Sequence, residues 1–262
     1  MVSNAFIKIW DQLVGASAWD AAKGIAFFEF EPVIQDGFNK ATKIEVSQLI
    51  ETAQAILYNE KTGEVKAGQV EAPRGFTHWL MKFDGVSDSE IGITKGYGRV
   101  EMAYHLMAKA AGIEMMECRL YEENGRAHFM TRRFDRVGNK QKLHVQSFCA
   151  LNHFDFNLVN DFSYEQLFGR MSFNVIAPAF HICHAYRPES NWVSQHALSV
   201  NGKRSYITRD DLLAVAKNMN IKKAPAILNQ IKETVASWKN YAVETKVAPK
   251  LGDAIGQTLI LL

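Results

Sequence analysis

The spacing of apolar residues changes near residue 134, and this change limits the fold more than any other feature of the sequence. Before it, short apolar or alternating runs lie between turn residues, which predicts strands over 5–10, 25–30, 55–58, 65–70, 79–83, 119–121 and 127–133. After it, apolar residues recur mainly at helical spacing. Strands followed by helices predict an α+β fold with two lobes and a cleft between them.

Turn residues indicate how the predicted strands connect. Gly15 indicates a break after the first strand, and the strands around it are expected to form a small antiparallel sheet. Residues 59–63 are a typical five-residue hairpin connection ending in glycine. Asn124-Gly125 is a strong signal for a tight turn between two paired strands.

Helices are predicted at four places. A stripe of apolar residues predicts a helix over 97–111, ending before Gly112, and a shorter amphipathic helix is expected over 45–54. Thr208 and Asp211 form a capping-box pattern that opens a helix over 212–219. Pro225 begins another helix, whose buried face is expected to carry Ile227, Ile231, Val235 and Trp238.

Composition excludes several classes of protein. Of the residues, 47% are hydrophobic and 22% charged, and the net charge is +2, which gives no reason to expect a dedicated nucleic-acid binder. Cys118, Cys149 and Cys183 are too scattered for a disulfide framework. Lys8 and Asp11 interrupt the first apolar segment, so no signal peptide is expected, and no apolar run is long enough to span a bilayer. We expect a cytoplasmic protein with no membrane partner.

Lys82 is the most informative residue, because it lies in an otherwise apolar strand. Such a lysine either extends outward to water from an edge strand or holds an anion in a cleft. The helix predicted after this strand carries Glu101, and a hairpin then leads to Arg132, Arg133 and Phe134. In protein kinases a strand lysine holds nucleotide phosphates, and a helix glutamate orients the lysine through an ion pair. The order of elements therefore favours a kinase N-lobe that runs into its hinge.

Three other groups of residues have less specific patterns. The basic side chains near 132–136 are expected to be solvated, while the backbone there could offer polar groups to an adenine. The glycine-rich segment 92–98 lacks both phosphate-loop patterns and is interpreted as a connection. His181, Cys183 and His184 have poor spacing for zinc, and a zinc-dependent hydrolase built on them is the least favoured alternative. Cys183 is expected to be a structural thiol rather than a nucleophile.

Taken together, several stretches resemble the HipA-like serine/threonine kinases, which are toxins of bacterial type II toxin–antitoxin systems. The most specific matches are Arg132-Arg-Phe-Asp-Arg136 and the Phe-Asn of 173–174 followed by Pro178-Ala-Phe180. The matching stretches extend from about residue 5 to about residue 245 and include 6–10, 15–19, 27–32, 75–83, 101–113, 132–136, 163–165, 170–174, 178–180 and 184–188.

The resemblance implies an atypical two-lobed, protein-kinase-like fold. Residues 1–40 would form an extra N-terminal β subdomain, 41–134 a β-rich N-lobe ending in the hinge, and 135–262 an all-helical C-lobe. Lys82 would hold the phosphates of ATP, with Glu101 orienting it by analogy with other kinases.

The resemblance also implies cofactor contacts and partners. Arg132, Arg133 and Phe134 would contact adenine through their backbone, and Phe180 and His181 occupy the family's metal-binding position. Family members use ATP and Mg²⁺ and phosphorylate proteins such as aminoacyl-tRNA synthetases, which blocks translation. A small helix-turn-helix antitoxin neutralises them and connects them to operator DNA.

The sequence departs from the family pattern at functional loops. Ala177 is followed directly by Pro178, where the family has a catalytic loop with the general-base aspartate and a metal-binding asparagine. A glycine-rich phosphate loop is missing before residue 55, and a third stretch is missing near residue 40. His181 replaces an aspartate that binds Mg²⁺, and an imidazole gives no negative charge to that hard ion.

Two explanations remain open for these departures. The sequence is either a set of joined segments from which mobile loops are missing, or it belongs to a degenerate or engineered inactive kinase. We favour the first, because three true excisions would also remove structural connections, although only the second explains His181. The leading hypothesis is an ATP-dependent serine/threonine protein kinase. The alternative is a catalytically dead kinase-fold module that acts by binding its antitoxin and operator DNA.

Overall fold

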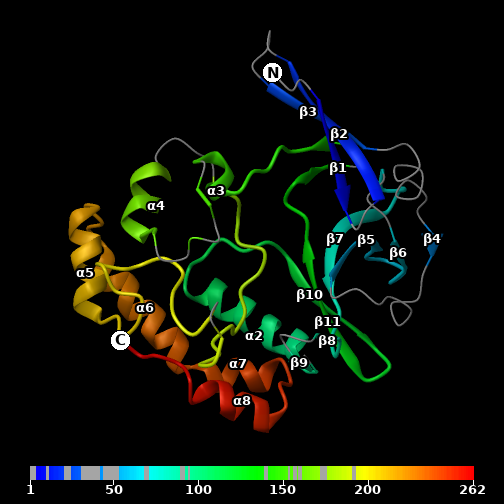
Figure 1. Ribbon diagram of the computed structural model, residues 1–262. Coiled ribbons are helices and arrows are strands. Elements are labelled where there is room, and N and C mark those ends of the chain that lie inside the picture. Colours follow the sequence, from blue (N-terminus) through cyan, green and yellow to red (C-terminus); the bar gives the residue numbers. More distant parts are fainter. Residues whose placement is uncertain are drawn as a thin grey trace. The chain divides into compact units, whose positions relative to one another are not determined.

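A computed structural model shows the fold (Figure 1). It describes residues 4–9, 12–20, 25–30, 42–43, 53–67, 71–88, 92–93, 95–138, 141–152, 154–155, 158, 161–171, 176–190 and 193–262. The chain combines antiparallel strands with helices, so the α+β prediction is confirmed. Two compact units divide the chain, one made of 1–49, 54–79 and 138–140, the other of 50–53, 80–137 and 141–262. They do not test the predicted boundaries after residues 40 and 134, which stay predictions.

The first unit begins with an antiparallel sheet of three strands, β1 (Asn4–Ile9), β2 (Gln12–Asp20) and β3 (Ile25–Phe30). An antiparallel sheet was predicted here from β1 and β3 alone, but the unpredicted strand β2 lies between them, and the break expected at Gly15 is wrong. Gly15 lies inside β2, opposite Ile7 on one side and Phe30 on the other. The strand tolerates the glycine beside a register shift between Ile7 and Lys8, a common place for glycine in a sheet.

The rest of the first unit is built on a hairpin of β5 (Ala53–Asn59) and β6 (Val65–Ala67), with β4 (Thr42–Lys43) paired to β6. The Asn59 side chain accepts hydrogen bonds from the N–H groups of Lys61 and Thr62, which closes the predicted turn. Leu57, Ala72 and Phe76 form its small core. The helix predicted over 45–54 is wrong at its end, because β5 already includes Ala53 and Gln54; residues 45–52 lie outside the described residues.

The second unit contains the hairpin of β10 (Cys118–Glu123) and β11 (Arg126–Arg132) and the helix α2 (Tyr97–Ala110). The predicted tight turn is confirmed, since Asn124 and Gly125 have φ of 46° and 74°. Strand β7 (Phe76–Lys82) contributes its last residues to this unit, where β11 is its neighbour in the sheet. Short strand pairs are formed by β8 (Ser87–Asp88) with β9 (Gly92–Ile93) and by β12 (Arg136–Val137) with β13 (Gln141–Lys142).

After the hairpin the chain is mainly helical, as predicted. Its helices are α3 (Phe148–Leu151), α4 (Tyr164–Arg170), α5 (Arg209–Asn218), α6 (Ala224–Ala236), α7 (Trp238–Glu244) and α8 (Pro249–Gly256). The expectation of an all-helical segment after residue 134 is wrong, because the β12–β13 pair turns at Gly138, whose φ is 60°. Thr208 and Asp211 form the predicted capping box of α5.

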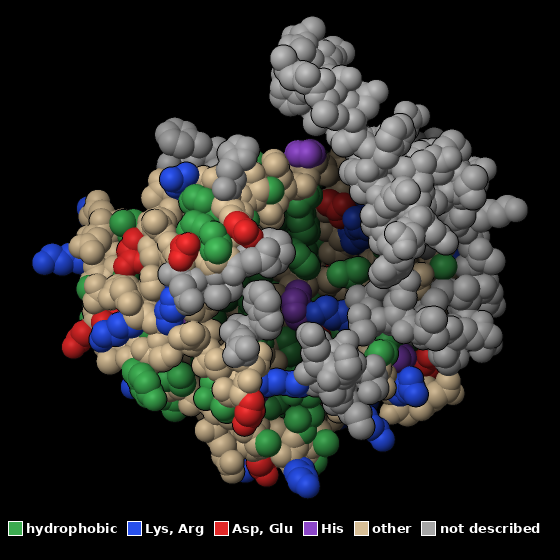
Figure 2. Space-filling view, in the orientation of Figure 1, with side chains coloured by type: hydrophobic (Ala, Val, Ile, Leu, Met, Phe, Trp, Pro, Cys, Tyr) green, Lys and Arg blue, Asp and Glu red, His purple; other side chains and the backbone are tan. Residues whose placement is uncertain are grey.

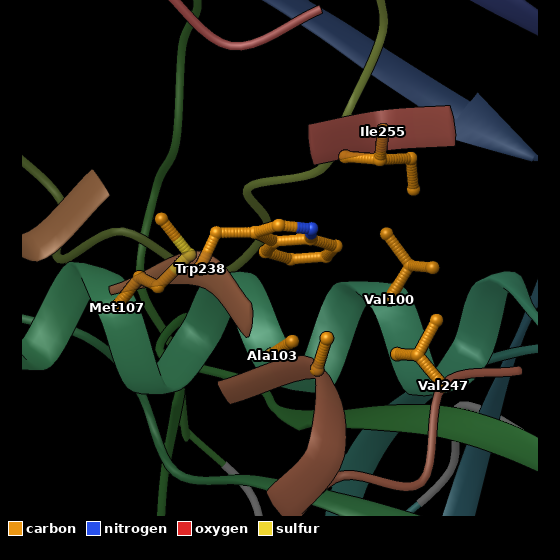
Figure 3. Close-up of a cluster of buried hydrophobic side chains, with 7 residues drawn as sticks. Val100, Ala103, Met107, Trp238, Val247 and Ile255 are labelled. Carbon is orange, nitrogen blue, oxygen red and sulfur yellow. The ribbon is translucent and has the colours of Figure 1, made fainter. Parts of the chain in front are cut away.

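The main core of the second unit surrounds Trp238, which α2, α7 and α8 enclose (Figure 3). The Trp238 indole N–H donates to the carbonyl of Gly252 over 2.8 Å. The predicted helix is divided, since α6 ends at Ala236 and Trp238 begins α7. Val235 packs against this core, but Ile227 and Ile231 are 43% and 39% exposed, so the burial predicted for these two residues is wrong. The apolar residues at the start of α6 therefore extend beyond the part of the helix that the core covers. No helix in the described part of the chain is long and apolar enough to cross a membrane.

Candidate functional site

The end of β7 positions Lys82. Trp79 and Met81 are fully buried, and Phe83 is almost fully buried, so this part of the strand is anchored on the core. The Lys82 side chain remains 28% exposed, and its Nζ lies 3.3 Å from Oε2 and 3.4 Å from Oε1 of Glu101. The amine therefore faces a carboxylate, and it does not simply extend to water. The roles predicted for both residues stay predictions.

The close packing of α2 on β11 positions Glu101. Gly98, in the first turn of α2, is buried against β11, and a Cβ there would collide with the carbonyl oxygen of Ala127. Only glycine permits this approach, which brings the next turn of the helix near the sheet. The Glu101 side chain is only 10% exposed, so the ion pair with Lys82 is shielded from water on the side of the carboxylate.

Backbone pairing positions His181. Ala179 forms a parallel bridge with Met115, and hydrogen bonds join Met116 N–H to Ala179 O and Ala179 N–H to Glu114 O. Two residues later, His181 Nδ1 lies 3.0 Å from Glu101 Oε2, and Lys82 Nζ lies 2.8 Å from Nδ1 and 3.0 Å from Nε2 of the same ring. Lys82, Glu101 and His181 are therefore in mutual contact, and we call these three side chains the Lys82 cluster.

Cys183 lies beside the Lys82 cluster. Burial is the main cause that raises the pKa of its thiol to about 12; the charge of Glu101 raises it further, and the charge of Lys82 acts against both. Cys183 is a protonated thiol at neutral pH, which is unsuited to act as a nucleophile. His184 makes a separate contact, with its Nε2 2.8 Å from Thr258 Oγ1, and burial lowers its pKa. The described residues contain no group of three His, Cys, Asp or Glu side chains able to hold a metal ion.

The donor atoms of the Lys82 cluster are poorly suited to magnesium. Mg²⁺ favours oxygen ligands, usually one or two carboxylates with water and phosphate oxygens. The Glu101 carboxylate is the one acidic group of the cluster, and it is already engaged by Lys82 and His181. His181 adds an imidazole, which suits zinc or copper better than magnesium. The described residues of the cluster therefore do not fit a protein-bound Mg²⁺.

The predicted hinge follows β11. Arg133 donates two hydrogen bonds to Asp135, of 2.8 and 2.7 Å, and Arg132 lies 3.5 Å from Glu117, so both guanidinium groups are paired with acids. Burial alone would raise the pKa of Asp135, but the hydrogen bond and charge of Arg133, followed by the charge of Arg136, lower it below the ordinary value. The predicted solvated cluster is therefore an ion-pair network at the end of the strand.

Phe134 and Phe180 form an aromatic pair that the sequence did not predict. Their ring centroids lie 5.4 Å apart with an interplanar angle of 36°, and Phe180 is 40% exposed. Because Phe180 directly precedes His181, the predicted hinge and the Lys82 cluster are connected through this pair. Local sequence patterns cannot predict a contact between residues 46 positions apart. The family resemblance had assigned both segments to the nucleotide site, but it had not predicted that the two rings touch.

The glycine-rich segment before α2 has a structural explanation. Gly96 is left-handed, with φ 88°, and its N–H donates to Asp84 Oδ1 over 2.6 Å, while Gly98 permits the packing of α2 on β11. The segment predicted as a connection therefore includes the short strand β9 and the first residues of α2. On the face of the molecule in Figure 2, acidic and basic side chains are interspersed rather than gathered into one large basic patch.

A family model and a solved structure are similar to this chain. The model of the HipA-like C-terminal domain matches residues 43–174, about half of the chain. Among solved structures, a match is the HipA chain of the HipA, HipB and operator DNA complex of the Shewanella oneidensis MR-1 toxin–antitoxin system. That match has a TM-score of 0.50 and 10% identity, and covers 86% of this chain and 67% of the other. A comparison with curated proteins finds no significant match.

Proposed function

Because the chain belongs to the family of the HipA-like C-terminal domain, we propose that it is an ATP-dependent serine/threonine protein kinase. The similarity to the HipA structure supports the same general fold, and we propose that this fold has the two lobes of a kinase. The observation that carries the proposal is the ion pair between Lys82 and Glu101, 3.3 Å apart, formed between a strand and the next long helix.

The Lys82–Glu101 pair can act as a phosphate clamp. In phosphoryl transfer the protein mainly positions the phosphates and neutralises their charge. Glu101 is largely buried and accepts from Lys82, so it limits where the ammonium can go. We propose that Lys82 binds ATP phosphates and that Glu101 keeps the lysine in position. Mg²⁺ neutralises phosphate charge in such kinases, but the side chains of the Lys82 cluster do not fit this ion.

The aromatic pair supports a place for the base of the nucleotide. Phe134 and Phe180 offer an apolar surface, and Phe180, which directly precedes His181, keeps 40% of its surface exposed. We propose that adenine lies against these rings, with polar contacts from the backbone of 132–134. The acid-paired side chains of Arg132 and Arg133 would then keep the segment extended and would not bind the base themselves.

The proposed substrate and partners come from the family. We propose that the chain transfers the γ-phosphate of ATP to a serine or threonine hydroxyl of a translation protein, such as an aminoacyl-tRNA synthetase, and acts as a toxin. The similar solved structure contains HipB and operator DNA, which supports a small helix-turn-helix antitoxin as the partner. Contact with DNA would then be made through the antitoxin.

A second candidate is a catalytically dead module that binds its antitoxin and, through it, operator DNA. Two observations favour it. The sequence has no general-base aspartate between Asn174 and Pro178, and His181 occupies the place of the metal-binding aspartate and contacts Lys82.

Phosphoryl transfer tests these candidates. The chain is incubated with Mg²⁺, ATP labelled at the γ-phosphate and a generic protein substrate, beside Lys82→Ala and Lys66→Ala. Lys66 is a matched control because it is also a strand lysine near a glutamate, with Nζ 3.8 Å from Glu64. The kinase proposal predicts transfer by the native chain and by Lys66→Ala, with a loss of at least about 100-fold in Lys82→Ala.

Two other results would change the proposal. Transfer that survives in Lys82→Ala would overturn the role of Lys82. No transfer by any variant, together with retained ATP binding or stable antitoxin binding, would favour the dead module.

A further inference from the structure

His181 contacts the amine that the proposed function assigns to phosphate. Lys82 Nζ has three N–H donors. Glu101 lies 3.3 and 3.4 Å from this nitrogen through its two carboxylate oxygens, and the His181 ring nitrogens lie 2.8 and 3.0 Å from it. Carboxylate and imidazole therefore already surround the donors that a phosphate would need.

The two neighbours of Lys82 differ in how firmly they are held. The Glu101 side chain is 10% exposed and lies on α2, which is packed closely on β11. The His181 side chain is 40% exposed and lies in a segment outside the helices and strands. Its backbone is anchored through Ala179, so a change of side-chain rotamer is enough to withdraw the imidazole from Lys82.

We propose that His181 is an internal competitor for Lys82, which lowers the affinity of the site for phosphate-bearing ligands until its imidazole is displaced. The proposal rests on the proposed function only in that Lys82 is the anion-binding group. In the ligand-free protein the His181 ring contacts both Lys82 Nζ and Glu101 Oε2. An incoming polyphosphate takes the place of the imidazole, while the Lys82–Glu101 pair stays.

The test measures anion binding without the nucleotide base. Calorimetric titration with inorganic tripolyphosphate is carried out on the native chain, His181→Ala, Lys82→Ala and the double variant. We expect His181→Ala to bind about three- to tenfold more tightly, because one hydrogen bond no longer competes. We expect no such gain in tripolyphosphate affinity in the Lys82→Ala background, because His181 then has no ammonium group to occupy.

Two matched variants separate competition from a general loss of packing. His184→Ala removes a nearby histidine that contacts Thr258, and it is expected to leave tripolyphosphate affinity unchanged. His181→Gln keeps an acceptor for Lys82 and is expected to gain less affinity than His181→Ala. Circular dichroism confirms that each variant is folded before it is titrated.

The outcomes distinguish this proposal from the proposed function. Equal or weaker binding by His181→Ala, an equal gain in the Lys82→Ala background, or no binding by any variant would overturn the competitor role. The same titrations with ATP test the nucleotide. Tighter tripolyphosphate binding by His181→Ala without any ATP binding would support the competitor and contradict the kinase.

Discussion

The thiols of Cys183 and Cys118 share the buried surroundings of Glu101. Burial is the main cause that raises the pKa of Cys183 to about 12 and that of Cys118 to about 11, while a hydrogen bond to Thr131 partly offsets the shift at Cys118. At pH 8 the thiolate fraction at Cys183 is on the order of 10⁻⁴. Iodoacetamide should therefore modify both thiols at least about 100-fold more slowly in the native protein than in urea.

Mass spectrometry of peptides after timed labelling measures this difference for each cysteine. The unfolded chain in urea is the control, because its cysteines have ordinary surroundings. Modification of native Cys183 at the rate seen in urea would contradict the buried position of this thiol beside the Lys82 cluster.

At the residue scale the sequence predicted the members of the site better than their contacts. Lys82 was identifiable because a charged residue interrupts an apolar strand, and Glu101 because the helix predicted after that strand carries it. The contact of His181 with Lys82 joins residues 99 positions apart and depends on the backbone bridge at Ala179. No local sequence pattern predicts such a bridge, and the contact between His181 and Lys82 was therefore not predicted.

Helix α2 depends on a close approach to β11. Substituting Gly98 by alanine places a Cβ against the carbonyl oxygen of Ala127, which belongs to the backbone and cannot rotate away. We expect Gly98→Ala to lower the free energy of unfolding by about 3 kcal/mol, at the upper end of what overpacking costs. Urea denaturation followed by tryptophan fluorescence measures the loss.

Gly169 in α4 is the matched control for Gly98. A Cβ added there would have no heavy atom within 4 Å, so alanine is expected to leave stability unchanged or raise it by up to about 1 kcal/mol. Equal stability of Gly98→Ala and the native chain would mean that α2 does not pack on β11 as described.

At the element scale, periodicity and turn chemistry predicted the main hairpins, α2 and α5, while elements such as β2, β12 and α4 were not predicted. The hairpin at Asn124-Gly125, the helix ending before Gly112 and the capping box at Thr208 follow from local steric and hydrogen-bonding rules. The errors at Gly15 and on α6 have another cause. Whether a glycine interrupts a strand, or an apolar stripe is covered, depends on neighbouring elements that the local sequence does not specify.

Stability of the whole molecule should depend on pH through two buried histidines. Burial lowers the pKa of His105, and the positive charge of Lys109 lowers it further. Burial also lowers the pKa of His128, although the negative charge of Glu123 partly offsets this shift. Below about pH 6.5 the unfolded chain binds protons that the folded chain does not, so stability falls as the pH decreases. Above that pH the two histidines are neutral in both the folded and the unfolded protein, so their contribution to the free energy of unfolding is constant.

Urea midpoints at pH 8.0, 6.5 and 5.0 measure the dependence. We expect the midpoint to change little between the first two and to fall clearly at the third. His105→Gln should flatten the fall, while His144→Gln, at an exposed position, should not. A midpoint that stays constant down to pH 5.0 would show that the buried histidines are not kept neutral by the fold.

At the scale of the whole molecule, the fold class followed from the order of strands and helices, but the family did not. Family membership rested on specific matches such as Arg132-Arg-Phe-Asp-Arg136, and the family model then confirmed it. The predicted division after residues 40 and 134 stays a prediction, as do the roles of the site residues. Function depends on the ligand that the site accepts, and neither pattern nor fold class specifies it.

The central claim is that the amine of Lys82 meets the phosphates of a nucleotide. A crystal structure of the protein with a non-hydrolysable ATP analogue tests it most directly. The account predicts a phosphate oxygen about 3 Å from Lys82 Nζ, with the Glu101 ion pair retained. A bound analogue whose phosphates lie away from Lys82, with the amine still held between Glu101 and His181, would contradict it.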